Sequence, residues 1–189
     1  MKPYLAVFFG LMCISQWYVP LAMIKDQEEV LSSGKVFRFK TRPVDPSDPF
    51  RGKYITLDFE AATFPDNSSR VWERGQKIFV LLGEDSDGFA RIVDLVEDNP
   101  DPEVDYVEAE VSFVDGENVS ITYPFERFYL EESRASDAEK VYRDANRNDS
   151  TQTAHAVVRI KNGKPALEDV MINDRSIVDI VRELNAEPE

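Results

Sequence analysis

An uncharged apolar run near the amino end constrains this chain more than any other feature. Residues 4–24 read YLAVFFGLMCISQWYVPLAMI and contain no Asp, Glu, Lys or Arg. A helix of this length rises about 31 Å, which matches the hydrocarbon thickness of a bilayer. The run therefore predicts one membrane-spanning helix that stays in place as an uncleaved anchor. A cleaved signal peptide is the alternative, but no pair of small residues for cleavage follows the run.

The residues on either side of the run predict its orientation. Lys2 precedes it and Lys25 follows it, so the positive-inside tendency gives little guidance. Because the lead before the run is very short and a large domain follows, we expect the amino end to stay in the cytoplasm. Cys13, the one cysteine of the chain, would then lie in lipid, where neither a disulfide nor a catalytic thiol is expected.

Charge and composition exclude several classes of function. The formal net charge of −14 argues against a nucleic-acid partner. One cysteine and one histidine, His155, cannot supply a Cys-rich zinc module or a His-clustered metal site. We therefore predict no cofactor and no metal ligands, and interpret His155 as an ordinary strand residue.

The rest of the chain predicts one acidic, β-rich domain. Residues 25–35 form a juxtamembrane connector or short helix, and residues 36–189 form the domain. Alternation of apolar and polar residues with period two predicts strands. These strands cover residues 36–40, 53–60, 78–82, 89–96, 106–114, 119–123, 157–160 and 165–170. The pair Asn162-Gly163 predicts that the last two form a hairpin. Residues 78–82 form a continuous apolar run that predicts burial on both faces, and residues 106–114 place Phe113 on the core face.

Two helices complete the predicted fold. Residues 136–139 have the pattern of a capping box, which predicts a helix beginning at Ser136. A second helix is predicted to begin at Ser176. The fold class is therefore α+β and β-dominant, an antiparallel sandwich or partly open barrel with two helices, preceded by one transmembrane helix.

Several short motifs occur in an order that resembles the GDYXXLXY family of bacterial proteins. Gly52, Tyr54 and Leu57 match the name-giving pattern, whereas Lys53 stands where Asp is usual and Phe59 where the second Tyr is usual. Further matches are Pro-Val-Asp-Pro at 43–46, Arg-Phe-Tyr-Leu-Glu at 127–131 and Asn-Gly-Lys-Pro-Ala-Leu at 162–167. The resemblance covers most of residues 36–170, together with the amino-terminal span.

The resemblance implies an envelope domain of unknown biochemical function, tethered to the inner membrane and facing the periplasm. It also implies a multi-pass membrane protein as a partner, and it brings no catalytic mechanism. The candidate binding residues are Arg51, Gly52, Tyr54, Tyr129 and Glu131. On period two, Tyr54 lies opposite the core face, where its hydroxyl either meets a partner or bonds to a neighbouring loop.

Two functional hypotheses follow. The first is a tethered binding or accessory module for a membrane partner. The second is a membrane-anchored hydrolase that uses paired carboxylates or a Ser-Lys pair, for which Ser47 and Lys53 are the nearest candidates. Acidic runs at 84–88 and 98–103 could supply oxygen ligands for calcium, but their spacing is not that of an EF-hand, and we interpret them as solvated turns. The first hypothesis is favoured.

Overall fold

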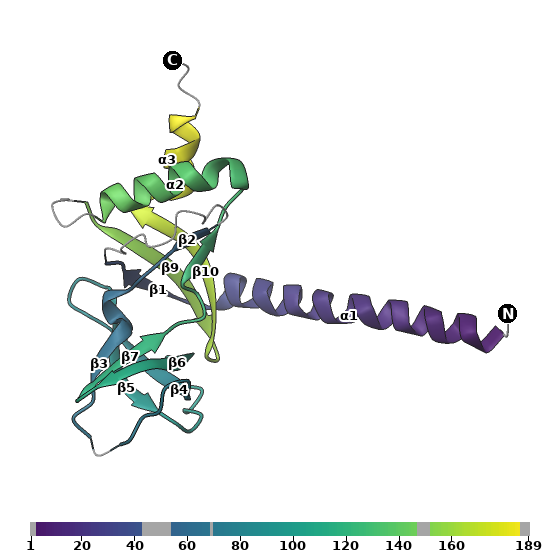
Figure 1. Cartoon of the computed structure of the whole chain (residues 1–189), viewed down its shortest axis with the longest axis horizontal. Helices are drawn as coiled ribbons and strands as arrows, with labels where there is room; N and C mark the ends of the chain where they lie inside the picture. Colours follow the sequence, from purple (N-terminus) through teal and green to yellow (C-terminus); the bar gives the residue numbers. More distant parts are fainter. Residues whose placement is uncertain (1–2, 43–53, 69, 147–151, 186–189) are drawn as a thin grey trace.

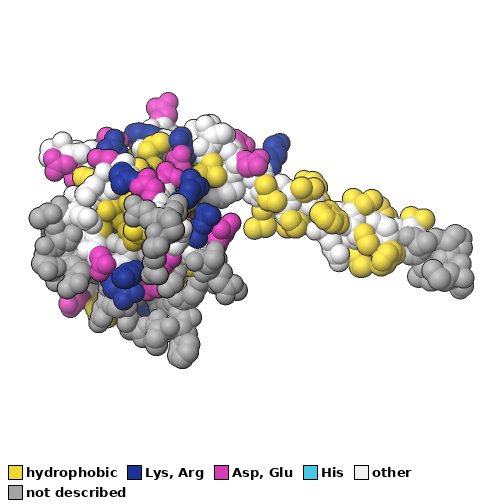
Figure 2. Space-filling model, turned by 90° about the horizontal axis from the view of Figure 1, so that it is seen from above, with side chains coloured by type: hydrophobic (Ala, Val, Ile, Leu, Met, Phe, Trp, Pro, Cys, Tyr) yellow, Lys and Arg dark blue, Asp and Glu magenta, His cyan; other side chains and the backbone are white. Residues whose placement is uncertain are grey.

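The computed structural model describes residues 3–42, 54–68, 70–146 and 152–185. The first element, α1 (Pro3–Ser33), projects away from the rest of the chain as a single long helix (Figure 1). Apart from Val30 near its end, the large apolar side chains described on α1 are exposed, and the apolar window has no residue buried against the domain (Figure 2). By length and composition α1 can cross a membrane, and a signal sequence would meet the same two criteria.

Antiparallel strands form the body of the domain. One sheet has the order β1-β9-β10-β11, a second has the order β3-β7-β6-β4-β5, and β2 pairs with β8 as a separate ribbon. The strands are β1 (Lys35–Lys40), β2 (Tyr54–Thr56), β3 (Thr63–Pro65), β4 (Lys77–Glu84), β5 (Ala90–Val96), β6 (Tyr106–Asp115), β7 (Asn118–Thr122), β8 (Arg127–Tyr129), β9 (Ala154–Lys161), β10 (Lys164–Ile172) and β11 (Arg175–Ser176). The predicted β-dominant α+β fold is confirmed.

Two helices pack at the end of the domain opposite the five-stranded sheet. They are α2 (Glu132–Ala145) and α3 (Ile177–Leu184) (Figure 1). A separate 3-10 turn, η1 (Glu60–Ala62), follows β2 in the chain. The predicted start of α3 is confirmed, because the Ser176 hydroxyl accepts a hydrogen bond from Val178 N at 3.2 Å. The prediction that the other helix begins with a capping box at Ser136 is wrong. The helix begins one turn earlier, with Glu131 at the N-cap position and no side-chain cap bond.

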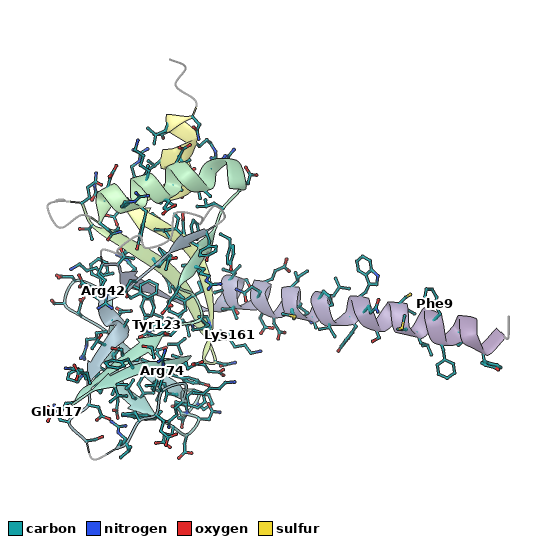
Figure 3. The ribbon with its side chains drawn as sticks, viewed as in Figure 1. Phe9, Arg42, Arg74, Glu117, Tyr123 and Lys161 are labelled. Carbon is teal, nitrogen blue, oxygen red and sulfur yellow. The ribbon has the colours of Figure 1, made fainter. Side chains whose placement is uncertain are left out.

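An aromatic cluster joins the two sheets. Phe39 of β1, Phe59, Tyr123 and Phe125 lie with ring centroids 5.0–6.0 Å apart. All four are buried. Tyr123, labelled in Figure 3, donates its hydroxyl hydrogen bond to the Ala61 carbonyl oxygen at 2.6 Å. Burial raises the pKa of Tyr123 far above its usual range, so the ring stays neutral. The core of the domain therefore lies between the sheets rather than within one of them.

Period two predicted most strand faces correctly, and two exceptions have physical causes. A β-bulge between Val111 and Phe113 inserts one residue, so Phe113 turns outward and is 59% exposed. In β4 the residues Ile78, Val80 and Leu82 are buried, whereas those between them are only half-buried. The prediction that both faces of this run are buried is wrong, because no layer of the described chain fully covers the outer face of the sheet.

The predicted hairpin at Asn162 and Gly163 is confirmed. Both residues have positive φ, 49° and 77°, as a type I′ turn requires, and Lys161 pairs with Lys164 across it. Asp87-Gly88 also forms a turn, with φ of 81° at Gly88. The turn chemistry of these pairs fixed the register of the strands on either side.

A buried carboxylate organises the segment between β3 and β4. The Asp66 side chain is 4% exposed and accepts hydrogen bonds from Trp72 Nε1 at 2.5 Å and Arg70 Nη2 at 3.2 Å. Arg70 also bonds to the Leu95 carbonyl oxygen and to Asp94 Oδ1, the latter at 2.6 Å. Burial raises the pKa of Asp66, but hydrogen bonds from Ser68, Trp72 and Arg70 outweigh burial and hold it well below its usual range.

Candidate functional site

The β2–β8 ribbon brings two of the sequence-predicted residues together. Tyr54 of β2 is the direct cross-strand partner of Tyr129 of β8, and their ring centroids are 5.6 Å apart. Ile55 and Phe128, the next residues on each strand, face the core and are buried. The tyrosines therefore lie on the outer face of the ribbon, where Tyr54 is half-buried and Tyr129 is 66% exposed.

A third side chain, Arg127, completes this group and was missed in the sequence. Its guanidinium carbon lies 5.0 Å from the centroid of the Tyr54 ring, within the range of a cation–π contact. A side-chain hydrogen bond with Tyr129, followed by electrostatic interactions with Tyr54 and Tyr129, raises the pKa of Arg127. The available signal was its position two residues before Tyr129, which places both on one face of a strand. We call these residues, Tyr54, Arg127 and Tyr129, the tyrosine–arginine patch.

The other predicted site residues do not join the patch in the described part of the chain. The main chain of Glu131 caps α2, and its exposed carboxylate lies 3.6 Å from Arg134 Nε. Arg51 and Gly52 lie outside the described residues, as do Ser47 and Lys53 of the hydrolase hypothesis. The patch thus contains two of the five predicted residues and adds one that was not predicted.

The patch has the chemistry of a recognition surface. Exposed tyrosine rings offer a large, stiff apolar area with a polar tip, and arginine offers a planar fork for carboxylates. Tyr and Arg are also the residue types that most often dominate binding energy in protein interfaces. Its three side chains include neither a nucleophile paired with a base nor a carboxylate pair.

An open groove lies on the five-stranded sheet. Its volume is about 350 Å³, and its lining comes from β4, β6 and the residues after β7. Lys77, Glu110 and Thr122 are in register across three neighbouring strands, and Phe79 lies beside them. Charged side chains, Lys77, Glu108 and Glu110, flank the groove. Tyr123, the buried ionisable residue of the lining, donates its hydroxyl hydrogen bond to the Ala61 carbonyl oxygen.

The acidic runs form turns. Asp85 accepts hydrogen bonds from Asp87 N at 2.9 Å and Phe89 N at 2.8 Å, and Asp101 accepts one from Glu103 N at 2.9 Å. Within the described ranges, no group of three or more His, Cys, Asp or Glu side chains converges as a metal site. The carboxylates of these runs are therefore used to shape the loops.

His155 lies buried in β9 and packs against another sheet. Its ring is 4% exposed and lies edge-on to Phe89, with centroids 5.6 Å apart. Nδ1 is buried and has no hydrogen-bond partner among the residues that the structure describes. Burial is the main cause that lowers the pKa of His155, Arg38 lowers it further and Asp174 opposes this. The neutral form of the imidazole is the one that fits this site.

Replacing His155 by Phe should flatten the dependence of stability on pH near neutrality. Since the folded state lowers the pKa of this group, the unfolded chain binds the proton more tightly. Stability is therefore lost as the pH falls below about 6.5, with a slope of at most about 1.4 kcal/mol per pH unit. Chemical denaturation of the wild type and of His155→Phe between pH 5 and 8 measures this slope. Equal slopes for the two proteins would contradict the assignment.

The fold and the patch together define a β-rich domain with an exposed aromatic and cationic surface, carried on one long apolar helix. Residues 16–170 match the family model described as GDYXXLXY protein, and the chain belongs to this family. The match spans most of the chain, from within α1 to within β10, and includes the whole five-stranded sheet and the β2–β8 ribbon. Searches of curated proteins and of solved structures give no match.

Proposed function

We propose that this protein is a membrane-anchored binding module whose domain holds a membrane partner through the tyrosine–arginine patch. The observation that carries the anchor is the uncovered apolar surface of α1. A soluble protein would leave this long row of large apolar side chains in water at high cost, whereas lipid covers them favourably. The patch supports the binding role, because it gathers interface-type residues on an exposed ribbon.

The proposed topology places the amino end in the cytoplasm and the domain in the periplasm, at the inner membrane of a bacterium. The family resemblance, which implies an envelope domain facing the periplasm, supports this orientation. A reporter enzyme that is active only outside the cytoplasm, fused after residue 189, tests the orientation. Activity of the fusion in membranes is expected, whereas recovery of a shortened protein in the soluble fraction would contradict the uncleaved anchor.

The proposed partner is a multi-pass membrane protein, as the family resemblance implied, and it presents a carboxylate to Arg127. Arg127 is exposed on a chain with a formal net charge of −14, so it is a local positive site on an otherwise acidic protein. An acidic group on the partner would be attracted to this site and repelled by most of the remaining surface. The charge pattern thus supports one orientation of binding.

Substitution of the patch should weaken retention of the partner. We expect Arg127→Ala and Tyr129→Ala each to lower the affinity by about 10- to 30-fold, as is usual for central Tyr and Arg residues of an interface. The measurement is quantitative co-purification of the partner from gently solubilised membranes. Phe113→Ala is the matched control, because Phe113 is also an exposed aromatic residue but lies on the five-stranded sheet, at 59% exposure against 66% for Tyr129. Equal retention by all variants would contradict the role of the patch.

A further inference from the structure

The end of the apolar run lies close to the point where α1 meets the domain. Ile24 is the last apolar residue of the run, and the same helix continues to Ser33. With a rise of about 1.5 Å per residue, Asp26 lies about 3 Å beyond Ile24 along the helix axis, and Glu29 about 7.5 Å beyond it. The headgroup layer on each side of a bilayer is about 5–7 Å thick. Asp26 therefore falls within that layer, and Glu29 at its outer boundary.

Two lysine side chains of the turn between β9 and β10 reach α1 at this same level. Lys164 Nζ lies 3.2 Å from Asp26 Oδ2, and Lys161 Nζ lies 2.7 Å from Glu29 Oε1. Lys161 also donates to the Ser33 hydroxyl at 2.9 Å. The side chain of Lys161 points from the domain toward the base of the helix, on the side of the domain that faces along α1 (Figure 3). Residues 161–164 are thus the part of the domain held nearest to the apolar run by direct contacts.

Packing on both sides prevents this turn from moving away from the helix. Val30 of α1 is buried against β9 and β10, and β1 begins at Lys35 without an intervening linker. On the other side, Glu108 N of β6 donates to the Gly163 carbonyl oxygen at 3.0 Å, and the Tyr106 ring lies directly over Gly163. The turn is fixed between α1 and the five-stranded sheet.

The side chains on the turn suit polar lipid headgroups. Lys161 and Lys164 carry ammonium donors and Asn162 an exposed amide, so the turn has no apolar side chain to insert into hydrocarbon. Phosphate and ester oxygens of lipids accept hydrogen bonds from such groups. Asp26 and Glu29 balance the two lysines, so the contact needs no excess of anionic lipid.

We propose that residues 161–164 lie in the lipid headgroup layer, so that the domain itself touches the membrane beside its anchor. This inference rests on the proposed anchoring of α1. It assigns a second membrane contact to the protein, made by a β-turn, and with it one fixed face of the domain toward the lipid. The far side of the domain, where Glu117 lies at the turn between β6 and β7, then faces away from the bilayer (Figure 3).

Depth-dependent fluorescence quenching tests this contact. The full chain carries Cys13→Ser and one new cysteine, at Lys164, Glu117 or Phe9, each labelled with an environment-sensitive fluorophore. The proteins are reconstituted into phosphatidylcholine vesicles that contain lipid with a nitroxide on the headgroup or on the acyl chain. We expect headgroup nitroxide to quench the label at 164 at least threefold more than the label at 117. Acyl-chain nitroxide should quench the label at 9.

The three label sites separate the two ways in which the inference can fail. If the label at 9 is quenched but the label at 164 behaves like the label at 117, the anchor stands and the turn does not touch lipid. If the label at 9 is not quenched, the anchoring fails and the inference fails with it. Asn162→Cys, exposed on the same turn and leaving both lysine pairs intact, replaces Lys164→Cys if that variant does not fold.

Discussion

Replacing Gly163 by alanine should lower the free energy of unfolding by about 2–4 kcal/mol, the sum of a left-handed backbone penalty and overpacking. Gly163 has φ of 77°, a conformation that costs a residue with a Cβ atom. A Cβ atom at this position would also overlap the Tyr106 ring of β6, which packs on the turn. Denaturant unfolding of the detergent-solubilised full chain, followed by tryptophan fluorescence, measures the loss.

Gly116→Ala is the matched control for this substitution. Gly116 also has positive φ, 59°, but an added Cβ atom would meet nothing within 4 Å. It should therefore show only the backbone penalty, about 1 kcal/mol. The difference between the two variants isolates the contact between the hairpin and Tyr106. An equal loss in both would show that the Tyr106 ring moves aside at no cost.

The second large effect is expected at Asp66. Asp66→Asn should lower the free energy of unfolding by about 3 kcal/mol at pH 7, because it removes the negative charge that a buried network is built to bind. Trp72 Nε1, Ser68 N and Arg70 all donate to this carboxylate. Denaturation of the two proteins at several pH values gives both the size of the loss and its pH dependence.

The pH dependence follows from the direction of the pKa shift. The folded state holds the pKa of Asp66 below that of the unfolded chain, so its contribution is fully present above about pH 4 and is lost as the pH falls further. The stabilities of wild type and Asp66→Asn should therefore converge in acid. Asp94→Asn is the control, since Asp94 pairs with the same arginine but its side chain is 41% exposed, and should cost less than about 1 kcal/mol. A pH-independent gap for Asp66→Asn would overturn this explanation.

Features with a local cause could be predicted from the sequence. The apolar run predicted α1, the Asn162-Gly163 pair predicted the hairpin, and Ser176 predicted the start of α3. In each case the cause lies in residues that are neighbours in sequence. The length of the apolar run matches the bilayer thickness, Asn-Gly accepts the positive φ of a hairpin turn, and the serine hydroxyl accepts a hydrogen bond from an otherwise unpaired N–H. The fold class followed, because most strands are long enough to show period two.

Features that depend on partners distant in sequence could not be predicted. β3 and β8 have three residues each, too few to reveal a period. The bulge that turns Phe113 outward depends on how β6 pairs with β7. Arg127 joins Tyr54 only because β2 and β8 pair across more than seventy residues, so the sequence motif could name Tyr54 and Tyr129 but not the contact between them.

Because no linker separates α1 from β1, the helix and the domain should move together as one rigid body. Because the helix, the hairpin turn and β6 are joined in series, a change in the tilt of α1 would rotate the whole body instead of bending a joint. Tilt responds to bilayer thickness. A thicker or thinner membrane would therefore displace the remote end of the five-stranded sheet relative to the bilayer. A partner bound to the domain would be displaced with it.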